Sequence, residues 1–410
     1  MTLTSTSRRA WLRGALAAGT AAATGSWASL SLAGVANPGD RRLVVVVLRG
    51  GMDGLWTVPA IGDPDFAAAR GALAEYAGGP LALSGPFALH PGFARLHEMW
   101  GRKELAVIHA TGLPYRERSH FDAQNVLEGG GERPYQLATG WLGRALKANG
   151  QSGMALSTAV PLILRGPANV DTWAPSNLPE PSGDLVARLA RVYANDPDLA
   201  GALARAKGLR DDGGMMMTAG AESGNMMAAG GKGASGALPG LTRKAGEFLL
   251  QPRGPKVVML EQGGWDSHAN LANEKSGFAT NLAQLDASLG ELREMLSAPK
   301  ADGLWQRTVV VVATEFGREV AINGTRGTDH GNGGAAFVLG GGVLGGQVLA
   351  DWPGLAKKDR FEGRDLRPTT DLRAVFKSLA ADQLQVPRAA LDNDIFPGTA
   401  GLKLPALIRA

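Results

Sequence analysis

Two runs of four valines constrain the fold of this chain more than any other feature of its sequence. They occupy residues 44–47 and 309–312, and neither alternates with polar residues. A strand that is apolar on both faces belongs in a parallel sheet covered by helices on each side. Further apolar runs predict more such strands at residues 105–109, 159–164, 256–261 and 335–339. Helical spacing of apolar residues predicts helices at 141–148, 183–208, 241–250, 278–296 and 370–379. The predicted fold class is therefore α/β, a three-layer α/β/α domain with a mainly parallel, doubly wound central sheet.

The composition is that of a globular protein without thiol chemistry. The chain has 410 residues, of which 44% are hydrophobic and 20% charged, enough to bury a sizeable core. It contains no cysteine, which excludes disulfides, thiolate metal sites and cysteine nucleophiles. The net charge is +4, and three of the positive charges are Arg8, Arg9 and Arg13. The remainder is close to neutral, so we expect no nucleic-acid partner, which would need a clustered basic face.

The N-terminal segment predicts export. Arg8 and Arg9 precede Trp11 and Leu12, and a weakly hydrophobic run rich in alanine and glycine ends in small residues at 34–36. This pattern resembles a twin-arginine signal over residues 1–36, cleaved or uncleaved. It implies the twin-arginine translocase as a partner and a periplasmic or secreted destination. A membrane anchor is the competing interpretation, but the run contains several threonines and serines, and we expect no stable membrane span in the mature chain.

A second segment differs in composition from the rest. Residues 213–240 are dominated by glycine, alanine, methionine and serine, with five methionines. Thioether ligands would suit copper, but no histidine or cysteine accompanies them. An insertion that is mobile or touches a partner is the favoured interpretation. Residues 37–410 are thus predicted to form a single domain that carries this insertion.

Acids and histidines cluster just after the predicted strands, where parallel sheets bind ligands. Oxygen and imidazole donors suit zinc, manganese, magnesium or calcium. Three of the six histidines lie in these segments, which favours a divalent metal centre. The alternative is that Asp266 caps a helix and His268 bonds a carbonyl. The candidate residues are Asp53, Ser119, His120, Asp122, Asp266, His268, Glu315, Asp329 and His330.

Five motifs occur in order along the chain: LRGGMDGL, RSHFDAQN, GGWDSHAN, TEFGR and GTDHGNGG. Behind a twin-arginine signal, this set resembles the exported bacterial family of domain of unknown function 1501. That family is grouped with the alkaline phosphatase and sulfatase superfamily. The resemblance implies an alkaline phosphatase-like fold and metal-dependent hydrolysis of phosphate or sulfate esters, with a small anionic ester as substrate.

The resemblance also implies roles for individual residues. It assigns metal binding to Asp53, Asp266, His268, Glu315, Asp329 and His330. It makes Ser119 the candidate nucleophile, flanked by Arg118 and His120, and offers Arg49 and Arg318 for anion binding. Phe316 stands where the superfamily usually has a histidine after the acid, so one metal, two metals or none remain open. The alternatives are a non-catalytic periplasmic binding or scaffold relative and, third, a copper or electron-transfer protein that uses the methionines.

Overall fold

The computed structural model describes residues 40–175, 181–214 and 237–409. Asp40–Ala410 forms one compact unit. The predicted export signal at 1–36 and most of the glycine- and methionine-rich segment at 213–240 lie outside the described residues. The predictions made for those two segments therefore stay predictions.

A nine-stranded sheet organises the described residues, in the order β10-β4-β9-β8-β1-β7-β5-β6 with β11 also paired to β4. Strand β9 runs antiparallel to β4 and β8, whereas the other pairings are parallel. The mainly parallel sheet predicted from the valine runs is thus confirmed. Its strands are β1 (Arg42–Leu48), β4 (Leu105–Gly112), β5 (Gly153–Ala155), β6 (Val170–Thr172), β7 (Val257–Gln262), β8 (Thr308–Thr314), β9 (Gly334–Leu339), β10 (Gln347–Leu349) and β11 (Thr370–Asp371).

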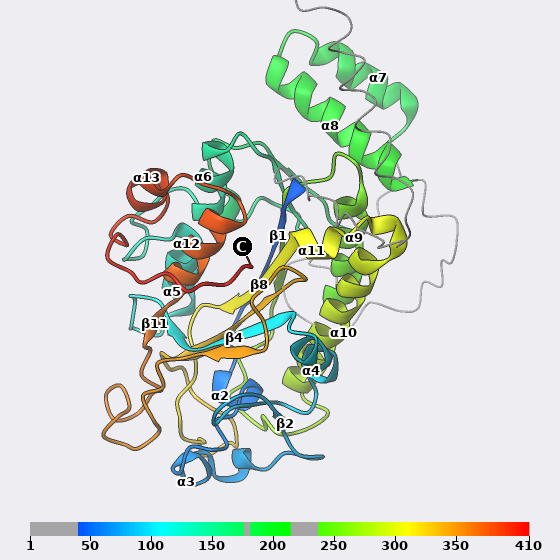
Figure 1. The fold of residues 1–410 in the computed structure, drawn as a ribbon. Helices are drawn as coiled ribbons and strands as arrows, with labels where there is room; N and C mark the ends of the chain where they lie inside the picture. Colours follow the sequence, from blue (N-terminus) through cyan, green and yellow to red (C-terminus); the bar gives the residue numbers. More distant parts are fainter. Residues whose placement is uncertain (1–39, 176–180, 215–236, 410) are drawn as a thin grey trace, which may run out of the picture. The chain divides into compact units, whose positions relative to one another are not determined.

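The valines of β1 explain why the sheet is covered on both faces. Val44 and Val46 belong to one hydrophobic cluster, and Val45 and Val47 belong to another, because successive side chains of a strand point to opposite faces. Three helices cover the first face, namely α4 (Ala94–Gly101), α9 (Leu238–Leu250) and α10 (Gly277–Ser297). Three others cover the second face, namely α5 (His120–Gly129), α6 (Trp141–Ala148) and α12 (Leu372–Asp382). Figure 1 shows these two groups on opposite sides of the strands, which confirms the three-layer α/β/α architecture.

The sequence prediction failed at residues 159–164. This segment was predicted to be a strand, but Leu162–Leu164 form a 3-10 turn. Pro161 lacks a backbone N–H to donate to a neighbouring strand. The same region contacts α6, where Gly140 and Gly143 allow close approach of the backbone at residues 162–165. The nearby strand is β5 instead, which pairs with β6 and β7.

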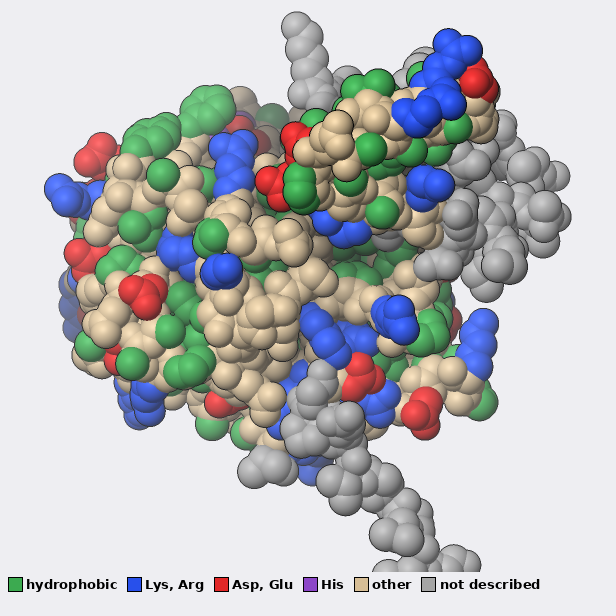
Figure 2. All heavy atoms as spheres, turned by 90° about the horizontal axis from the view of Figure 1, so that it is seen from above, with side chains coloured by type: hydrophobic (Ala, Val, Ile, Leu, Met, Phe, Trp, Pro, Cys, Tyr) green, Lys and Arg blue, Asp and Glu red, His purple; other side chains and the backbone are tan. Residues whose placement is uncertain are grey.

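Further elements lie outside these two groups. The helices are α2 (Gly54–Thr57), α3 (Phe66–Arg70), α7 (Gly183–Val192), α8 (Pro197–Gly214), α11 (Leu304–Arg307) and α13 (Arg388–Ala390), and β2 (Leu81–Ala82) pairs with β3 (Ala88–Leu89). Within the described ranges, no helix combines the length and hydropathy needed to cross a bilayer. On the face seen in Figure 2, lysine and arginine side chains lie scattered among acidic, apolar and other side chains.

Candidate metal centre

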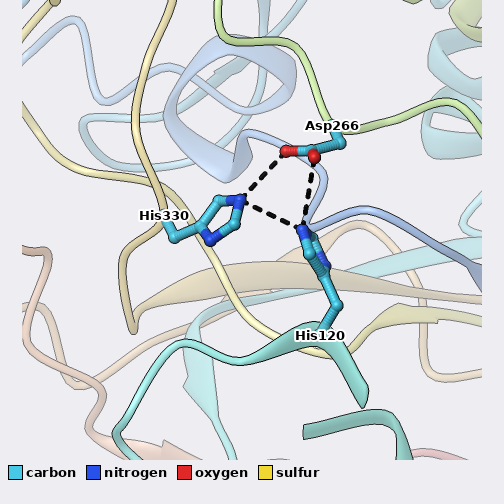
Figure 3. Close-up of side chains that lie close together, drawn as sticks. All are labelled: His120, Asp266 and His330. Atoms are coloured by element: carbon cyan, nitrogen blue, oxygen red, sulfur yellow. Dashed lines mark hydrogen bonds and ion pairs between the residues drawn. The ribbon is translucent and has the colours of Figure 1, made fainter.

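Three side chains from distant parts of the chain meet at the carboxyl edge of the sheet. His120 is the first residue of α5, Asp266 lies in the loop after β7, and His330 lies in the loop between β8 and β9 (Figure 3). The two histidine Nε2 atoms are 3.0 Å apart. The carboxylate of Asp266 is 3.0 Å from His330 Nε2 through Oδ1 and 3.4 Å from His120 Nε2 through Oδ2. Among the described residues, this trio has the spacing of a metal-binding set.

A third histidine adjoins the trio. The Nε2 atom of His268 lies 3.1 Å from Nε2 of His330 and 3.0 Å from Oδ1 of Asp266. Asp266 and His268 are two residues apart in the loop after β7, and both contact Nε2 of His330. The structure therefore brings together His120, Asp266, His268 and His330, which are up to 210 residues apart in sequence.

The other ring nitrogen of each histidine is held by an oxygen atom. Nδ1 of His120 lies 2.8 Å from Oε1 of Glu315, and Nδ1 of His268 lies 2.9 Å from Oδ1 of Asp329. Nδ1 of His330 lies 3.1 Å from the backbone carbonyl of Arg118. Because all three oxygens accept hydrogen bonds, a neutral ring can carry its proton on Nδ1, which leaves a lone pair on Nε2. The carboxylate of Asp266, 3.0–3.4 Å from the three Nε2 atoms, would accept a proton carried there instead.

The distances between these ligand atoms test whether a cation fits. Two unprotonated nitrogens at 3.0 Å repel each other unless a proton or a cation lies between them. Ligand atoms about 2.0–2.1 Å from one ion are about 2.9 Å apart at a right angle and about 3.3 Å apart in a tetrahedron. The observed separations of 3.0–3.4 Å match this range. Imidazoles oriented through Nδ1 by carboxylates or carbonyls are the usual arrangement around protein-bound metals. The residues present therefore fit a divalent cation.

Arg318 fixes the position of the Asp266 carboxylate. Its side chain is buried, and Nη2 donates to Oδ1 of Asp266 at 2.6 Å. Its donors also bond the backbone carbonyls of Gly50, Gly51, Trp265 and Thr328, and Nη1 lies 3.5 Å from Nε2 of His268. Because Arg318 uses Oδ1, the Oδ2 atom of Asp266 is left with a contact to His120 alone among the interactions described.

The charges around the centre keep its carboxylates ionised. Burial alone would raise the pKa of Asp266, but hydrogen bonding and charge attraction from Arg318 lower it to about 2. Burial likewise opposes ionisation of Glu315, yet its pKa is lowered by hydrogen bonds from His120, Gln124 and the backbone N–H of Gly50. The pKa of Asp329 is lowered chiefly by its hydrogen bond with His268. Both the ligand carboxylate and the two carboxylates behind the histidines are thus anionic near neutral pH.

The two histidines of the trio respond to this environment in opposite directions. For His120, burial favours the neutral ring, but Glu315 and Asp266 outweigh it and raise the pKa. For His330, burial and the positive charges of Arg318 and His120 lower the pKa despite the bond with Asp266. A bound cation would compete with any proton on these Nε2 atoms.

Glycines allow the loops that carry the ligands to pack closely. The backbone of residues 317–319 pairs with that of residues 329–331, through an isolated bridge between Arg318 and His330. A Cβ on Gly317 would lie 1.7 Å from the carbonyl oxygen of Gly333, and one on Gly327 would lie 2.2 Å from backbone carbon of His268. Only residues without a side chain permit these approaches.

Asp53 does not join the trio, although it follows β1 as predicted. Its side chain caps α2 by accepting from the Trp56 N–H, forms a 2.8 Å ion pair with Arg70, and accepts from the Thr328 hydroxyl. Its carboxylate is buried with these three partners. Metal binding by Asp53 stays a prediction, and the site proposed below does not include it.

The predicted anion-binding arginines have their donors engaged within the protein. Arg49 bonds Glu261, Gln124 and Glu128, and Arg118 bonds Glu362 and Asp365. Arg318 is engaged as described above. The contribution of Arg118 to the centre is its backbone carbonyl, presented to His330 from a left-handed conformation with φ of 63°.

Ser119 directly precedes His120, at the start of α5. Its hydroxyl makes no capping bond to the first turn of that helix and interacts with the Tyr115 side chain. Two neighbours of the centre, Gln124 and Phe316, were not among the predicted site residues. Gln124 donates to Glu315 at 3.0 Å, and the Phe316 ring packs against His120 and His330. The four-residue spacing of His120 and Gln124, which places them on one helix face, is a signal that would have found Gln124.

Comparisons with known proteins give one family match. A family model described as protein of unknown function (DUF1501) matches residues 100–386, more than half of the chain. These residues include His120, Asp266, His268, Glu315 and His330. A search of curated proteins found no match.

Several solved structures are similar at low identity. The C-terminal periplasmic domain of EcEptC from Escherichia coli, in complex with Zn, is 10% identical with a TM-score of 0.43, over 91% of this chain and 94% of that chain. The lipoteichoic acid synthase LtaP from Listeria monocytogenes is 12% identical with a TM-score of 0.39, over 87% and 76%. A protein in the alkaline phosphatase superfamily from Vibrio parahaemolyticus is 13% identical with a TM-score of 0.40, over 84% and 67%. No residue role, ligand or activity is carried over from them.

Proposed function

This chain belongs to the family described as protein of unknown function (DUF1501), and we propose that it is a divalent-metal-dependent hydrolase of phosphate or sulfate esters. One observation carries the proposal. The Nε2 atoms of His120 and His330 and the carboxylate of Asp266 converge within 3.0–3.4 Å, while the Nδ1 atoms are held by Glu315 and the Arg118 carbonyl. These three atoms have the separations expected of ligands around a single divalent cation.

His120, Asp266 and His330 would hold the metal, and His268 is placed to add a fourth ligand. Glu315 and Asp329 orient the rings of His120 and His268, and Arg318 orients Asp266. When bound, a divalent cation supplies Lewis-acid polarisation of a phosphoryl or sulfuryl oxygen and neutralises the charge developing on it. The ligand side chains are 23–42% exposed, so a small ester can reach the centre.

Ser119 is the candidate nucleophile. The resemblance in the RSHFDAQN motif assigns it this role, and its position directly before the ligand His120 supports it. In this proposal, Ser119 Oγ forms a bond to phosphorus or sulfur as the bond to the leaving alcohol breaks. Water then releases phosphate or sulfate and restores the hydroxyl. The positive end of α5 favours an anionic group at this position.

One observation favours a second candidate, a non-catalytic relative that binds a ligand through the metal. Most side-chain donors of Arg49, Arg118 and Arg318 are engaged by other protein groups. A hydrolase of this kind then relies on the cation and on backbone N–H groups for transition-state charge. Measured turnover of an ester substrate would distinguish the hydrolase from the non-catalytic relative.

We also propose that the chain is exported by the twin-arginine route to the periplasm or beyond. The support is Arg8 and Arg9 followed by a weakly hydrophobic run. Because that route carries folded proteins, the metal centre would form before export. We expect a reporter fused to the wild-type segment to be exported. The same fusion should stay in the cytoplasm when both arginines are replaced by lysine. Equal export of both fusions would contradict the proposal.

Metal analysis followed by activity assays tests the hydrolase proposal. Elemental analysis of purified protein should find about one zinc, manganese, magnesium or calcium ion per chain. A panel of aryl phosphates and aryl sulfates should give turnover that a chelator abolishes and the metal restores. Ser119→Ala and Asp266→Ala should each lose activity by at least about a hundredfold.

Ser157→Ala is the matched control, because Ser157 is a half-buried serine whose hydroxyl donates to the Ala159 carbonyl, and no interaction described links it to the centre. It should retain wild-type turnover. Metal binding without any turnover on the panel would favour the non-catalytic candidate. Identical residual turnover in wild type and in both site variants would remove the hydrolase proposal.

A further inference from the structure

Two arginines hold the candidate ligand His330, one at its ring and one at its backbone. Nδ1 of the ring lies 3.1 Å from the backbone carbonyl of Arg118. The backbone carbonyl of His330 accepts a hydrogen bond of 2.9 Å from Nη2 of Arg364. Arg118 directly precedes Ser119, whereas Arg364 lies in the loop between β10 and β11. The placement of this ligand therefore depends on what holds the two arginines.

A single carboxylate, that of Asp365, lies between the two arginines. Its Oδ2 atom accepts a hydrogen bond of 2.8 Å from Nε of Arg118 and lies 2.8 Å from Nη2 of the same side chain. Its Oδ1 atom lies 3.5 Å from Nη1 of Arg364. Asp365 is thus a partner that both arginine contacts of His330 have in common.

Asp365 also binds the segment that follows His330. Its Oδ2 atom accepts a hydrogen bond of 2.8 Å from the side-chain amide of Asn332. Its backbone forms isolated bridges with Glu319 and Phe361. The side chain is fully buried, at 0% exposed. Three segments of the chain around the candidate centre are therefore joined at this one residue.

The other acids beside the two arginines are more exposed than Asp365. Glu362 lies 2.6 Å from Nη2 of Arg118, but its side chain is 59% exposed. Glu319 lies 3.0 Å from Nε of Arg364 and is 24% exposed. Exposed ion pairs hold their partners weakly, whereas a buried carboxylate must keep its partners to remain ionised in the interior. Asp365 is therefore the firmest of these anchors.

The backbone of Arg118 needs such an anchor. Its φ of 63° is a left-handed conformation, which is unfavourable for a residue that has a side chain. This conformation presents the Arg118 carbonyl to Nδ1 of His330. The ion pair between the Arg118 guanidinium and Asp365 offsets the unfavourable backbone conformation and keeps the carbonyl in place.

We propose that Asp365 is a positioning residue of the candidate metal centre. Through Arg118 and Arg364, it holds His330 in the orientation that presents Nε2 to the ion. The inference rests on the metal centre of the proposed function and adds to it a residue that does not bind the metal. Among the interactions described, Asp365 does not contact the three side chains of the trio directly, so its effect passes through the arginines.

Zinc affinity, measured by competition with a chromophoric chelator, tests this role. Loss of a group that orients a ligand histidine lowers metal affinity by about ten- to a hundredfold, and Asp365 acts from one group further away. Asp365→Ala should therefore weaken zinc binding by about tenfold. Unchanged zinc affinity in this variant would overturn the proposal.

Asp286→Ala is the matched control for general destabilisation. Asp286 is likewise a buried acid, and it accepts hydrogen bonds from the backbone N–H groups of Arg95 and Leu96 at the start of α4. No interaction described links it to the centre. This variant should be less stable than the wild type and bind zinc equally well. Equal losses of zinc affinity in Asp286→Ala and Asp365→Ala would contradict a specific role for Asp365.

A double-mutant cycle tests whether Asp365 acts through Arg118. Arg118→Ala removes the guanidinium that binds Asp365, so it should also weaken zinc binding. Since the two residues act along one route, the double variant should lose less affinity than the product of the two separate losses. Losses that multiply would show that the residues act independently and would overturn the proposal.

Two variants at position 118 keep the proposal testable even if Asp365→Ala does not fold. Arg118→Gly and Arg118→Ala both remove the guanidinium, but glycine adopts φ near 63° without strain. Arg118→Gly should therefore bind zinc about three- to tenfold tighter than Arg118→Ala. Equal zinc affinities in the two variants would show that the anchored backbone conformation does not matter, against the proposal.

Other outcomes separate this inference from the proposed hydrolase activity. Zinc binding that depends on Asp365, without turnover of any ester, would remove the activity and support the positioning role. If the wild type binds no zinc, crystal structures of the metal-free wild type and Asp365→Ala decide. The contact of 3.1 Å between His330 Nδ1 and the Arg118 carbonyl should be lost in the variant. A retained contact would overturn the inference.

Discussion

Each histidine at the candidate metal centre uses its two nitrogens differently. Nδ1 of His120 faces Glu315, Nδ1 of His268 faces Asp329, and Nδ1 of His330 faces a carbonyl. The rings cannot turn without breaking these bonds, so the Nε2 atoms stay directed at one another. At the scale of residues, the cation site is built by the groups behind the ligands as much as by the ligands.

Replacement of Asp266 by asparagine should weaken zinc binding by at least about a hundredfold. The change removes the one carboxylate of the trio and leaves the Arg318 guanidinium without its anionic partner, so positive charge beside the ion is no longer offset. Competition with a chromophoric chelator measures the affinity.

Asp329→Asn is the matched control for that measurement. The carboxylate of Asp329 contacts Nδ1 of His268 and not the centre itself. Its loss should therefore lower the affinity for zinc by about ten- to a hundredfold, less than the loss of Asp266 does. Equal affinities in the wild type and Asp266→Asn would contradict the assignment of Asp266 as a ligand.

At the scale of elements, the site depends on how closely the two ends of the loop between β8 and β9 pack against each other. Gly317→Ala should destabilise the protein and weaken metal binding, because its Cβ would overlap the Gly333 carbonyl and push apart the segments that carry Arg318 and His330. We expect a loss of about 2–4 kcal/mol in the free energy of unfolding, measured by urea denaturation of the metal-free protein.

Gly324→Ala provides the comparison, since a Cβ at Gly324 would meet no atom within 4 Å. This variant should be as stable as the wild type and bind metal equally well. If Gly317→Ala and Gly324→Ala behave alike, close packing of these loop ends does not set the geometry of the centre.

The strands could be predicted from the sequence because their apolar runs are long and unbroken. The runs at 44–47 and 309–312 became β1 and β8, and strand ends then placed acids and histidines at one edge of the sheet. Hydrophobicity alone could not exclude the false strand at 159–164, where Pro161 and packing against α6 decide the conformation.

Side-chain partners were harder to predict than positions. Asp53 lies at the expected edge, but Arg70, which neutralises it, is 17 residues away on a different helix. Sequence position likewise gave no means of knowing that Arg49, Arg118 and Arg318 would bond other protein groups. These outcomes depend on tertiary contacts between loops that carry no periodic pattern.

At the scale of the whole molecule, a buried histidine links stability to pH. His109 is fully buried on β4, with Nε2 bonded to the Val58 carbonyl at 2.8 Å and Nδ1 accepting from the Ala110 N–H. Burial lowers its pKa to about 4 from the ordinary 6.5. At pH values between these two, His109 binds a proton in the unfolded chain but stays neutral in the folded protein.

Stability should therefore be complete above about pH 6.5 and fall as the pH drops toward 4. The slope contributed by His109 is about 1.4 kcal/mol for each pH unit in that window. Burial also lowers the pKa of His90 to about 4, which adds a slope of the same sign.

His109→Gln should reduce this pH dependence, because glutamine can donate to Val58 and does not titrate. Urea denaturation at pH 7, 6 and 5, in the presence of a chelator, measures the slope. A slope in the variant equal to that of the wild type would contradict the role of His109.

The sequence separation of the converging side chains sets an order of events. His120 and His330 are 210 residues apart, and four strands, β5, β6, β7 and β8, lie between them in chain order, so the two histidines meet only when the sheet has assembled around β1. An incomplete chain has no such chelate to offer. Metal binding would then require the completed fold, so a molecule that contains the ion would already be fully folded before it meets a substrate.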